Sequence, residues 1–382
     1  MPTLPRFAFV PLLFAPWLAA QTTLIVGAGG FATINAALAA AVPGDIVLVQ
    51  PGSYAGFQAT IGVTIRGAVS GAAFVTSQSS VTNAGAPVHL VDLDLKFVSV
   101  NGSTCSLDRC RVTAIQSFGG SCLSATNAFV HLADCAIGAA GDPPQVGIFS
   151  YGLFAAASTV GAVDSTIRGR DRDQLSFSGG TAGLYISAGS TFHGSRLLVR
   201  GGDGAANSAN PPGPALYASV DSTVWISDST LSGGVATNLG AAPWQCPVDA
   251  ADGRLVRCTL LPATCAPPVI AQTGALLGVH RAAPLLAGAP LQLDFHAEPN
   301  QFVGVFASFG IASFSFFELE QPTSLDLATL FPLSVLVADA SGFATGTWLV
   351  PPGTQDQALW LQAVTPGPLP LQLSPLTGGV VR

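Results

Sequence analysis

Charge is scarce in this sequence. Lysine, arginine, aspartate and glutamate make up 9% of the 382 residues, and Lys96 is the single lysine, whereas an average soluble domain is about 25% charged. The formal net charge is −7, and no basic stripe could neutralise a run of phosphates. The composition therefore excludes a nucleic-acid partner. Hydrophobic residues, at 49%, are numerous enough to build a folded core.

Long apolar runs are missing beyond the amino terminus. No later segment reaches the roughly 18 uninterrupted apolar residues of a membrane-spanning helix. At the start, Arg6 supplies a positive charge, residues 7–14 form a short apolar run, and Ala19 and Ala20 precede Gln21. This pattern predicts a signal peptide over residues 1–20, with an uncleaved membrane anchor as the alternative. We expect a secreted or cell-surface protein with no membrane span after signal cleavage.

Cysteines paired at metal-binding spacing are also lacking. The chain has seven cysteines and no Cys-x-x-Cys motif, so the short paired spacings typical of a zinc site are absent. In an exported protein, cysteines suggest disulfides, and the odd count leaves at least one thiol free or paired between chains. The cysteines form an early and a late group: Cys105, Cys110, Cys122 and Cys135, then Cys246, Cys258 and Cys265.

The sequence does contain an internal repeat. A six-residue pattern recurs, with an apolar residue first and last, Asp, Arg or Gly third, and Cys or Ser fourth. Its period is close to 30 residues, with steps of 25, 30, 30, 34 and 29. Short strand-like runs separated by Gly, Asp and Asn fill each period, and no helix of useful length fits between them. The Cys/Ser position falls at Cys110, Cys135, Ser165, Ser195, Ser229 and Cys258.

This period predicts a parallel β-helix. A helix-free repeat near 30 residues excludes ankyrin and tetratricopeptide repeats, and it is shorter than a propeller blade of about 40 to 45 residues. Successive turns of a β-helix stack at about 4.8 Å and bury their apolar faces only by stacking. We therefore expect the Cys/Ser positions to form a ladder along the coil.

The opening of the coil has a distinct pattern. Residues 31–54 predict a helix capped by Thr33, a turn at Pro43-Gly44, one buried strand and a second turn at Pro51-Gly52. This segment resembles the start of pectin-lyase-like proteins, in which a short amphipathic helix covers the first turn. The resemblance implies an all-β fold, a right-handed parallel β-helix with a short N-terminal capping helix, over residues 21–266. It implies a fold and leaves the function open.

One segment imitates a nucleotide-binding fingerprint. A strand-like run over residues 22–26 is followed by Gly27-Ala28-Gly29-Gly30-Phe31-Ala32 and a helix, as in the G-x-G-x-x-A motif. A dinucleotide site needs an acidic residue at the end of the second strand, whereas Asp45 precedes that strand. We therefore expect no organic cofactor, with calcium as the one alternative cofactor, at acidic residues described below.

The chain changes character after Cys265. Pro267 and Pro268 open a predicted linker over residues 267–284, and longer alternating strands follow. They predict a β-sandwich over residues 285–382, which resembles a module at the ends of large exported bacterial proteins. The resemblance implies no defined chemistry, and adhesion or docking onto the β-helix is an analogy. The expected strands span residues 291–295, 302–306, 333–337, 347–350 and 359–364.

Enzymes of the pectin-lyase-like family place charge on one face of the coil. The resemblance implies either hydrolases with two or three carboxylates or lyases with carboxylate-bound calcium and an Arg or Lys base. Family motifs such as Asn-Thr-Asp with Asp-Asp and Gly-His-Gly do not occur, and the chain has no adjacent Asp pair. No family catalytic site is therefore recognisable in the sequence.

The best remaining charged group lies between residues 168 and 203. Counted from the repeat, Arg170 and Arg200 both follow a ladder serine by five positions, and Asp173 and Asp203 follow by eight. We expect them to stack, with Asp142 extending the acidic row. The catalytic candidates are Asp173, Asp203, Arg170 and Arg200, and the calcium candidates are Asp142, Asp173 and Asp203. The alternative is a solvated loop whose charges pair for about 0–1 kcal/mol.

Aromatic residues and histidines offer further candidates. Tyr185, Tyr217 and Trp225 lie in repeat strands and could stack on sugar rings if they face outward, although strand aromatics more often pack on neighbours. The histidines are scattered without metal-ligand spacing, and no G-x-S-x-G serine motif occurs. We expect core or surface roles for His89, His131, His193, His280 and His296.

Two functional hypotheses follow. The scarcity of charge favours an exported, non-catalytic β-helix that serves as a surface or matrix protein and recognises polysaccharide or a cell-surface glycan along one long face. The alternative is a polysaccharide lyase or glycoside hydrolase that acts on an acidic glycan through the charged residues named above.

Overall fold

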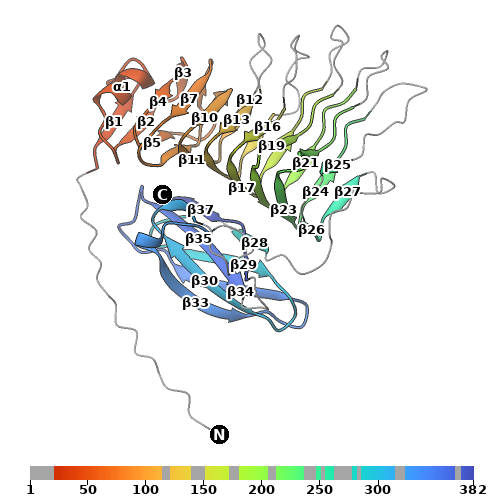
Figure 1. The fold of residues 1–382 in the computed structure, drawn as a ribbon. Coiled ribbons are helices and arrows are strands. Elements are labelled where there is room, and N and C mark those ends of the chain that lie inside the picture. The colour runs from red at the N-terminus through yellow and green to blue at the C-terminus, as the bar shows by residue number, and fades with distance from the viewer. Residues whose placement is uncertain are drawn as a thin grey trace, which may run out of the picture.

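The protein consists of a coil of parallel strands and a smaller antiparallel β-sandwich beside it (Figure 1). The computed structural model describes residues 21–113, 121–138, 151–171, 180–204, 212–235, 247–250, 254–261, 278–281, 285–314, 323–365 and 371–382. The predicted signal peptide lies outside these residues. Within them, no helix is long and apolar enough to cross a membrane.

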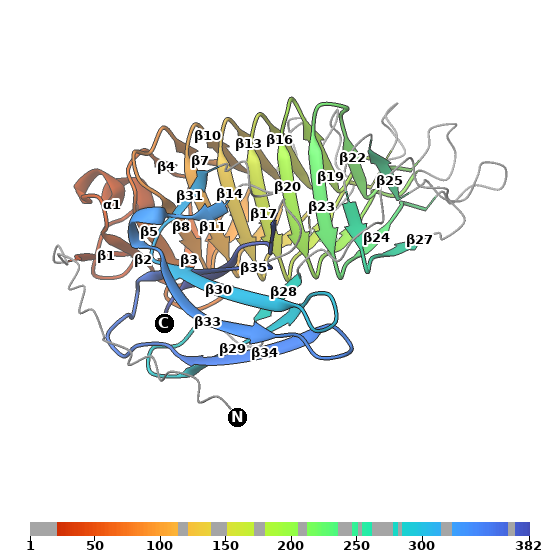
Figure 2. The same ribbon diagram turned by 60° about the horizontal axis from the view of Figure 1, so that its bottom comes forward.

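The coil is a parallel β-helix, as the repeat predicts, and its turns contribute strands to three sheets (Figure 2). In the described residues, sheet 1 contains β1 (Thr23–Val26), β2 (Ile46–Val49), β5 (Thr64–Gly67), β8 (Val88–Val91), β11 (Thr104–Asp108), β14 (Phe129–Ala133), β17 (Thr159–Val163), β20 (Thr191–Ser195), β23 (Thr223–Ser227) and β26 (Arg254–Val256). Sheet 2 contains β3 (Gly52–Tyr54), β6 (Ala73–Val75), β9 (Asp94–Lys96), β12 (Arg111–Thr113), β15 (Ala136–Ile137), β18 (Thr166–Arg168), β21 (Leu198–Arg200), β24 (Thr230–Ser232) and β27 (Thr259–Leu261). Sheet 3 contains β4 (Gln58–Ala59), β7 (Ser79–Thr82), β10 (Val98–Asn101), β13 (Leu123–Thr126), β16 (Leu153–Ala156), β19 (Leu184–Ser187), β22 (Leu216–Ala218) and β25 (Val248–Ala250).

Alternate side chains of these strands point into the coil and form a continuous core. Leu90, Leu107 and Leu132 occupy the same register position in successive turns of sheet 1 and are fully buried. Burying a leucine stabilises a fold by about 1.5–3 kcal/mol. Because each of these side chains is covered by its equivalents one turn away, a single turn could not bury them. The apolar period in the sequence thus becomes the core of the coil.

The corner between sheets 1 and 2 carries the third position of the repeat. Its residues have a left-handed backbone with φ between 49° and 56°, which aspartate tolerates because its short side chain bonds locally. At three turns an arginine takes this place and forms an ion pair, at 2.6–3.1 Å, with the aspartate one turn earlier. We call these residues the charged corner: Asp92, Arg109, Asp134, Asp164, Arg196, Asp228 and Arg257.

The Cys/Ser ladder follows the charged corner, with one correction. Ser165 Oγ accepts a hydrogen bond from the ladder residue one turn earlier, Cys135, through its backbone N at 3.1 Å. Ser195 is not part of the ladder, because it ends β20 opposite Val163, and Leu197 takes the ladder position. The prediction was wrong by two residues at this turn. The local pattern fits residues 192–197, but the inter-strand hydrogen bonds align residues 194–199.

Cysteines in the ladder serve as hydrogen-bond donors. The thiols of Cys110 and Cys135 donate to the carbonyl oxygens of Leu90 and Leu107, at 3.4 and 3.3 Å. Burial raises the pKa of the Cys110 thiol to about 12. The expectation of disulfides is therefore not met by four of the cysteines, whose thiols are free: Cys105, Cys110, Cys135 and Cys258. Cys246 and Cys265 lie outside the described residues.

Helix α1 (Ile34–Ala40) covers the first turn of the coil. Thr33 Oγ1 accepts from the backbone N of Ala36 at 3.1 Å, which confirms the predicted N-cap. In the nucleotide-like segment, a Cβ on Gly30 would lie 2.0 Å from the carbonyl oxygen of Ile25. Packing of the turn against β1 therefore explains this glycine without a bound phosphate.

The sandwich has two antiparallel sheets, as predicted. One contains β28 (Gly278–Arg281), β29 (Pro290–His296) and β34 (Phe343–Leu349); the other contains β33 (Phe331–Val337), β30 (Phe302–Ser308), β35 (Ala358–Thr365), β36 (Gln372–Leu373) and β37 (Thr377–Val380). A short pair, β31 (Ile311–Phe314) with β32 (Thr323–Leu325), and the 3-10 helix η1 (Leu327–Thr329) complete the described elements. Strand β28 falls inside the segment assigned to the linker and pairs with β29.

The sandwich lies along the outer face of sheet 1 (Figures 1 and 2), with β28 against β20 and β37 against β11 and β14. Trp360 of β35 is completely buried, in an apolar cluster that includes Phe129 of the coil. The two parts therefore share an apolar contact, and sheet 1 is the sheet on which the sandwich docks.

Candidate functional site

Three of the predicted charged residues, Arg170, Arg200 and Asp203, lie where strands of sheet 2 lead into the loops toward sheet 3. Asp142 and Asp173 lie outside the described residues. Arg168 pairs in register with Arg200, and Arg170 lies beside Gly202. The expected stacking of Arg170 on Arg200 is therefore wrong by two residues, for the same reason that Ser195 was misplaced.

Around Asp203 the charges form a closely bonded cluster. Arg168 Nη2 lies 2.5 Å from Asp171 Oδ2 and 3.4 Å from Asp203 Oδ2, and Arg200 Nη2 lies 2.7 Å from Asp203. Asp171 Oδ1 accepts from the backbone N of Asp203, and Asp203 Oδ1 accepts from the backbone N of Val235, both at 2.8 Å. Each carboxylate thus ties its own turn to the next. This arrangement suits a structural role.

Replacing Asp203 with alanine is expected to destabilise the coil by about 1–3 kcal/mol, because the backbone N of Val235 and the Arg200 guanidinium lose their acceptor. Urea denaturation would measure the change in the free energy of unfolding. The matched control is Asp94→Ala, which removes a pair with the half-exposed Arg111 and should cost at most about 1 kcal/mol. Equal losses in both variants would contradict the tie between turns.

Calcium remains a prediction. Among the residues described, no three His, Cys, Asp or Glu side chains gather as metal ligands. Asp203 is held by two arginines, and the other two candidates, Asp142 and Asp173, are not described.

Sheet 3 presents an aromatic stack on its outer face. Phe154, Tyr185 and Tyr217 occupy the same outward register position in β16, β19 and β22. The ring centroids of Tyr185 and Tyr217 are 4.6 Å apart with planes at 20°, and Tyr151 stacks on Tyr185 at 4.3 Å. All four rings are half-buried. The tyrosines therefore face outward, as sugar binding would require, and they also pack on one another, as strand aromatics commonly do.

Earlier turns continue this outer face with polar side chains. In β7, β10 and β13 the same register position holds Ser80, Ser99 and Ser124, and a second row two residues along the strands holds Thr82, Asn101 and Thr126. The face is therefore hydroxyl-rich over these turns and aromatic over the next three. The sequence alone could have revealed this polar and aromatic face, because every second residue of each predicted strand faces the same way.

Three of the histidines that are scattered in the sequence lie in one row. His89, His131 and His193 share the outer register position of sheet 1, with Ser106 and Gly161 between them. Neighbours in this row are two strands, about 9.6 Å, apart, which is too far to share a metal ion. Trp360 of the sandwich packs edge-on against His131 at 5.1 Å. Burial lowers the pKa of His131 and of His193 to about 3. Trp225 follows in the row and contacts His193 at 4.6 Å.

The charged corner is the second contact line between coil and sandwich. Arg281, whose side chain is 3% exposed, lies 2.7 Å from Asp134 and 3.8 Å from Asp108. His280 and His296 lie 3.4 and 3.0 Å from corner aspartates. Two further ion pairs between the described parts of coil and sandwich join Arg382 to Asp92 and Arg66 to Asp356. Arg281 and Arg382 of the sandwich thus form ion pairs with Asp134 and Asp92 of the corner.

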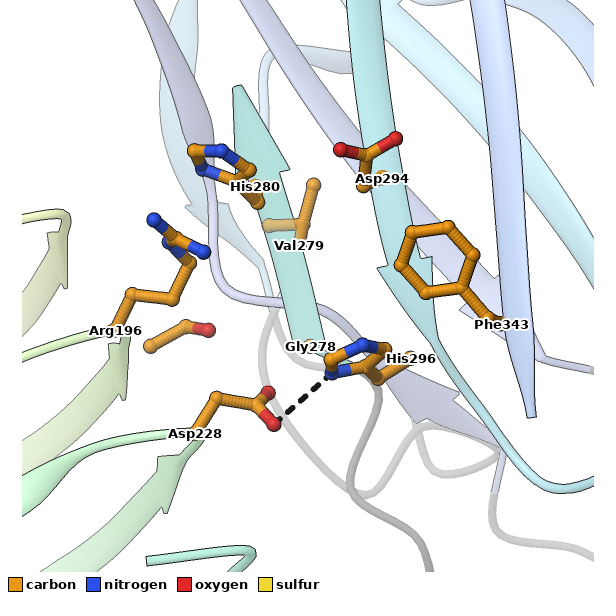
Figure 3. A pocket seen from close by; sticks show the side chains of 9 residues that line it. Arg196, Asp228, Gly278, Val279, His280, Asp294, His296 and Phe343 are labelled. Atoms are coloured by element: carbon orange, nitrogen blue, oxygen red, sulfur yellow. Dashed lines mark hydrogen bonds and ion pairs between the residues drawn. The ribbon is translucent and has the colours of Figure 1, made fainter. Parts of the chain in front are cut away.

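A pocket of about 100 Å³ lies where the charged corner meets the sandwich (Figure 3). Asp228 bonds to His296 at one end, and His280 and Asp294 lie at the other. Burial alone would raise the pKa of Asp228, but the hydrogen bonds and charges of Arg257 and His296 outweigh it and hold the pKa below its usual value. About three water molecules fill such a volume, so the pocket is too small for a sugar.

A wider cleft of about 430 Å³ separates the first turns of the coil from the sandwich. Thr64, Pro87 and His89 line it from the coil, and Phe309 and Gln357 line it from the sandwich. The His89 ring uses Nδ1 in a 2.7 Å hydrogen bond with Ser106. The cleft is large enough for a small ligand, but it gathers no group of charged or catalytic side chains among the residues that line it.

No protein-family model and no curated protein sequence matches the chain. Among solved structures, a mannuronic acid specific polysaccharide family 6 lyase enzyme from human gut microbiota matches 64% of this chain and 83% of its own, at 10% sequence identity and a TM-score of 0.19. Similarity at this level supports no argument about the site. The functional interpretation therefore rests on the geometry described above.

Proposed function

We propose that this is an exported, non-catalytic surface or matrix protein that binds polysaccharide through the outer face of sheet 3. The observation that carries the proposal is the outward stack of Tyr151, Phe154, Tyr185 and Tyr217, which continues into rows of serine and threonine. Sheet 1 is less suitable because the sandwich docks on it. Export is supported by the apolar run at residues 7–14.

The chemistry of the stack suits a sugar ligand. Each inner ring has its faces against neighbouring rings, so the stack offers a row of ring edges and phenol hydroxyls to solvent. Tyrosine combines apolar surface with a hydroxyl that donates and accepts. Burial, followed by the charge and hydrogen bond of Tyr217, raises the pKa of Tyr185 above its usual value, so this hydroxyl stays neutral at neutral pH. A sugar also alternates C–H surface with hydroxyls.

Tyr185→Ala combined with Tyr217→Ala is expected to weaken polysaccharide binding by about tenfold or more, because aromatic anchors carry much of the energy of an interface. Affinity electrophoresis against a panel of soluble polysaccharides would measure this. The control is Phe74→Ala, which removes a 44% exposed aromatic ring from sheet 2 and should leave binding unchanged. The proposal fails if no polysaccharide binds the unaltered protein.

The alternative proposed from the sequence is a lyase or hydrolase acting on acidic glycans through Asp173, Asp203, Arg170 and Arg200. Assays for unsaturated ends and reducing ends, with pectate and alginate and with and without calcium, would detect either activity. Loss of that activity in Asp203→Asn, with the folded state retained, would establish the enzyme. Activity that is unchanged in Asp203→Asn would exclude this residue as catalytic.

A further inference from the structure

We infer that the ligand of sheet 3 is an uncharged polysaccharide chain that lies parallel to the coil axis, with its sugars on the hydroxyl rows at one end and on the aromatic stack at the other. This inference rests on the proposed function and adds the class and the direction of the ligand.

The absence of charge is the first argument. From β4 to β22, the outward position of sheet 3 holds in turn Gln58, three serines, Phe154, Tyr185 and Tyr217, and none of these described residues is charged. The first charge on this row is Asp249 in β25, which would repel an acidic chain. By contrast, sheet 2 places Asp94 and Arg111 on its outer face.

Nearby arginines do not change this conclusion. Arg168 and Arg200 at the loop base are bonded to Asp171 and Asp203, at 2.5–3.4 Å. An acidic glycan laid across sheet 3 would have to break these pairs or leave its carboxylates unpaired, and an unpaired charge is costly to desolvate. A neutral chain meets no such cost.

Three serine hydroxyls on the outer face of sheet 3 are available for a ligand. Serines at the coil corners use their hydroxyls inside the protein, as when Ser158 Oγ donates to the carbonyl oxygen of Ala156 at 2.8 Å. Within the described part of the chain, the hydroxyls of Ser80, Ser99 and Ser124 have no hydrogen-bond partner. Each can donate one and accept two hydrogen bonds, which matches the hydroxyls of a neutral sugar.

Direction and length follow from the register. Equivalent residues of neighbouring turns lie about 4.8 Å apart along the axis, so the row from Gln58 to Tyr217 spans six steps, about 29 Å. Hydroxyls and rings repeat along the coil axis, from one turn to the next. In the perpendicular direction, along a strand, the face of sheet 3 is only two to four residues long. A chain along the axis therefore meets many more equivalent groups than a chain across it.

The test is titration calorimetry of the purified protein with cello- and xylo-oligosaccharides from disaccharide to octasaccharide, and with oligogalacturonates and oligomannuronates of the same lengths. We expect neutral oligomers to bind, with affinity rising by at least tenfold between disaccharide and octasaccharide. Ser99→Ala with Ser124→Ala should weaken the octasaccharide about tenfold. Thr166→Val, on the exposed face of sheet 2, is the control and should change nothing.

Four other results would overturn the inference and separate it from the proposed function. Tighter binding of acidic oligomers would reject an uncharged ligand. If Tyr185→Ala still weakened that binding, sheet 3 would remain a glycan site. Affinity that is independent of length, or unaffected by the two serine changes, would reject the axial chain while the aromatic site stands. Silence with every oligosaccharide would reject both.

Discussion

Replacing Arg281 with leucine is expected to destabilise the protein by about 3–5 kcal/mol, the usual result of breaking a buried charge pair from one side. The Arg281 guanidinium lies 2.7 Å from Asp134 and 3.8 Å from Asp108, and it donates to the carbonyl oxygen of Gly378 at 2.8 Å. Asp108 is 1% exposed, and burial raises its pKa to about 6 even with Arg281 and Arg109 beside it. Without Arg281, only Arg109 among the described residues remains to offset the cost of burying the negative charge of Asp108.

Thermal and urea unfolding would measure the loss, and limited proteolysis would show whether the sandwich leaves the coil first. Adding Asp108→Asn to Arg281→Leu should recover part of the stability, because the buried charge is then removed from both sides. The control is Arg111→Leu, whose partner Asp94 lies in an exposed pair and whose loss should cost about 0–1 kcal/mol. If Arg281→Leu costs no more than Arg111→Leu, the charged corner does not hold the sandwich.

Lowering the pH from 6 to 4 is expected to reduce the free energy of unfolding by about 5 kcal/mol. Burial lowers the pKa of His131 and His193 to about 3 and that of His89 to about 4, from 6.5 in the unfolded chain. Between these values the unfolded chain binds protons that the folded protein does not, so stability falls as the pH falls. Asp108 acts in the opposite direction, because its pKa is raised from 3.8 to about 6. Three histidines less one aspartate leave a net difference of about two protons, and each pH unit then changes stability by about 2.7 kcal/mol.

Urea denaturation at pH 6, 5 and 4 would give this slope. His131→Leu removes one of the three imidazole protons taken up on unfolding and should flatten the slope by about 1.4 kcal/mol per pH unit. His280→Asn is the comparison, since the His280 side chain is only partly buried and lies at the charged corner. A slope that survives His131→Leu unchanged would mean that the buried imidazole is not the source of the acid sensitivity.

Most of the coil was predictable because its information is local. Apolar residues at every second position, with small residues at the turns, determine which side chains point inward, and Thr33 marks the start of α1 by its own hydrogen bond. The strands of the sandwich were predictable for the same reason. The candidate site was less predictable from the sequence. Tyr185 and Tyr217 were recognised as strand aromatics, but their stacking depends on the alignment of strands 32 residues apart.

By itself, the sequence determined the period, the inward faces, the capping helix and the scarcity of charge. Only the tertiary structure decided that Leu197 and not Ser195 continues the ladder, that Asp171 and Asp203 tie successive turns, and that three distant histidines lie in one row under the sandwich. Arg281 meets Asp134 across 147 residues. The strand register and the docking of the sandwich depend on hydrogen bonds, buried area and paired charges between segments far apart in the chain. A local sequence pattern that fits two registers equally well contains no information about these long-range interactions.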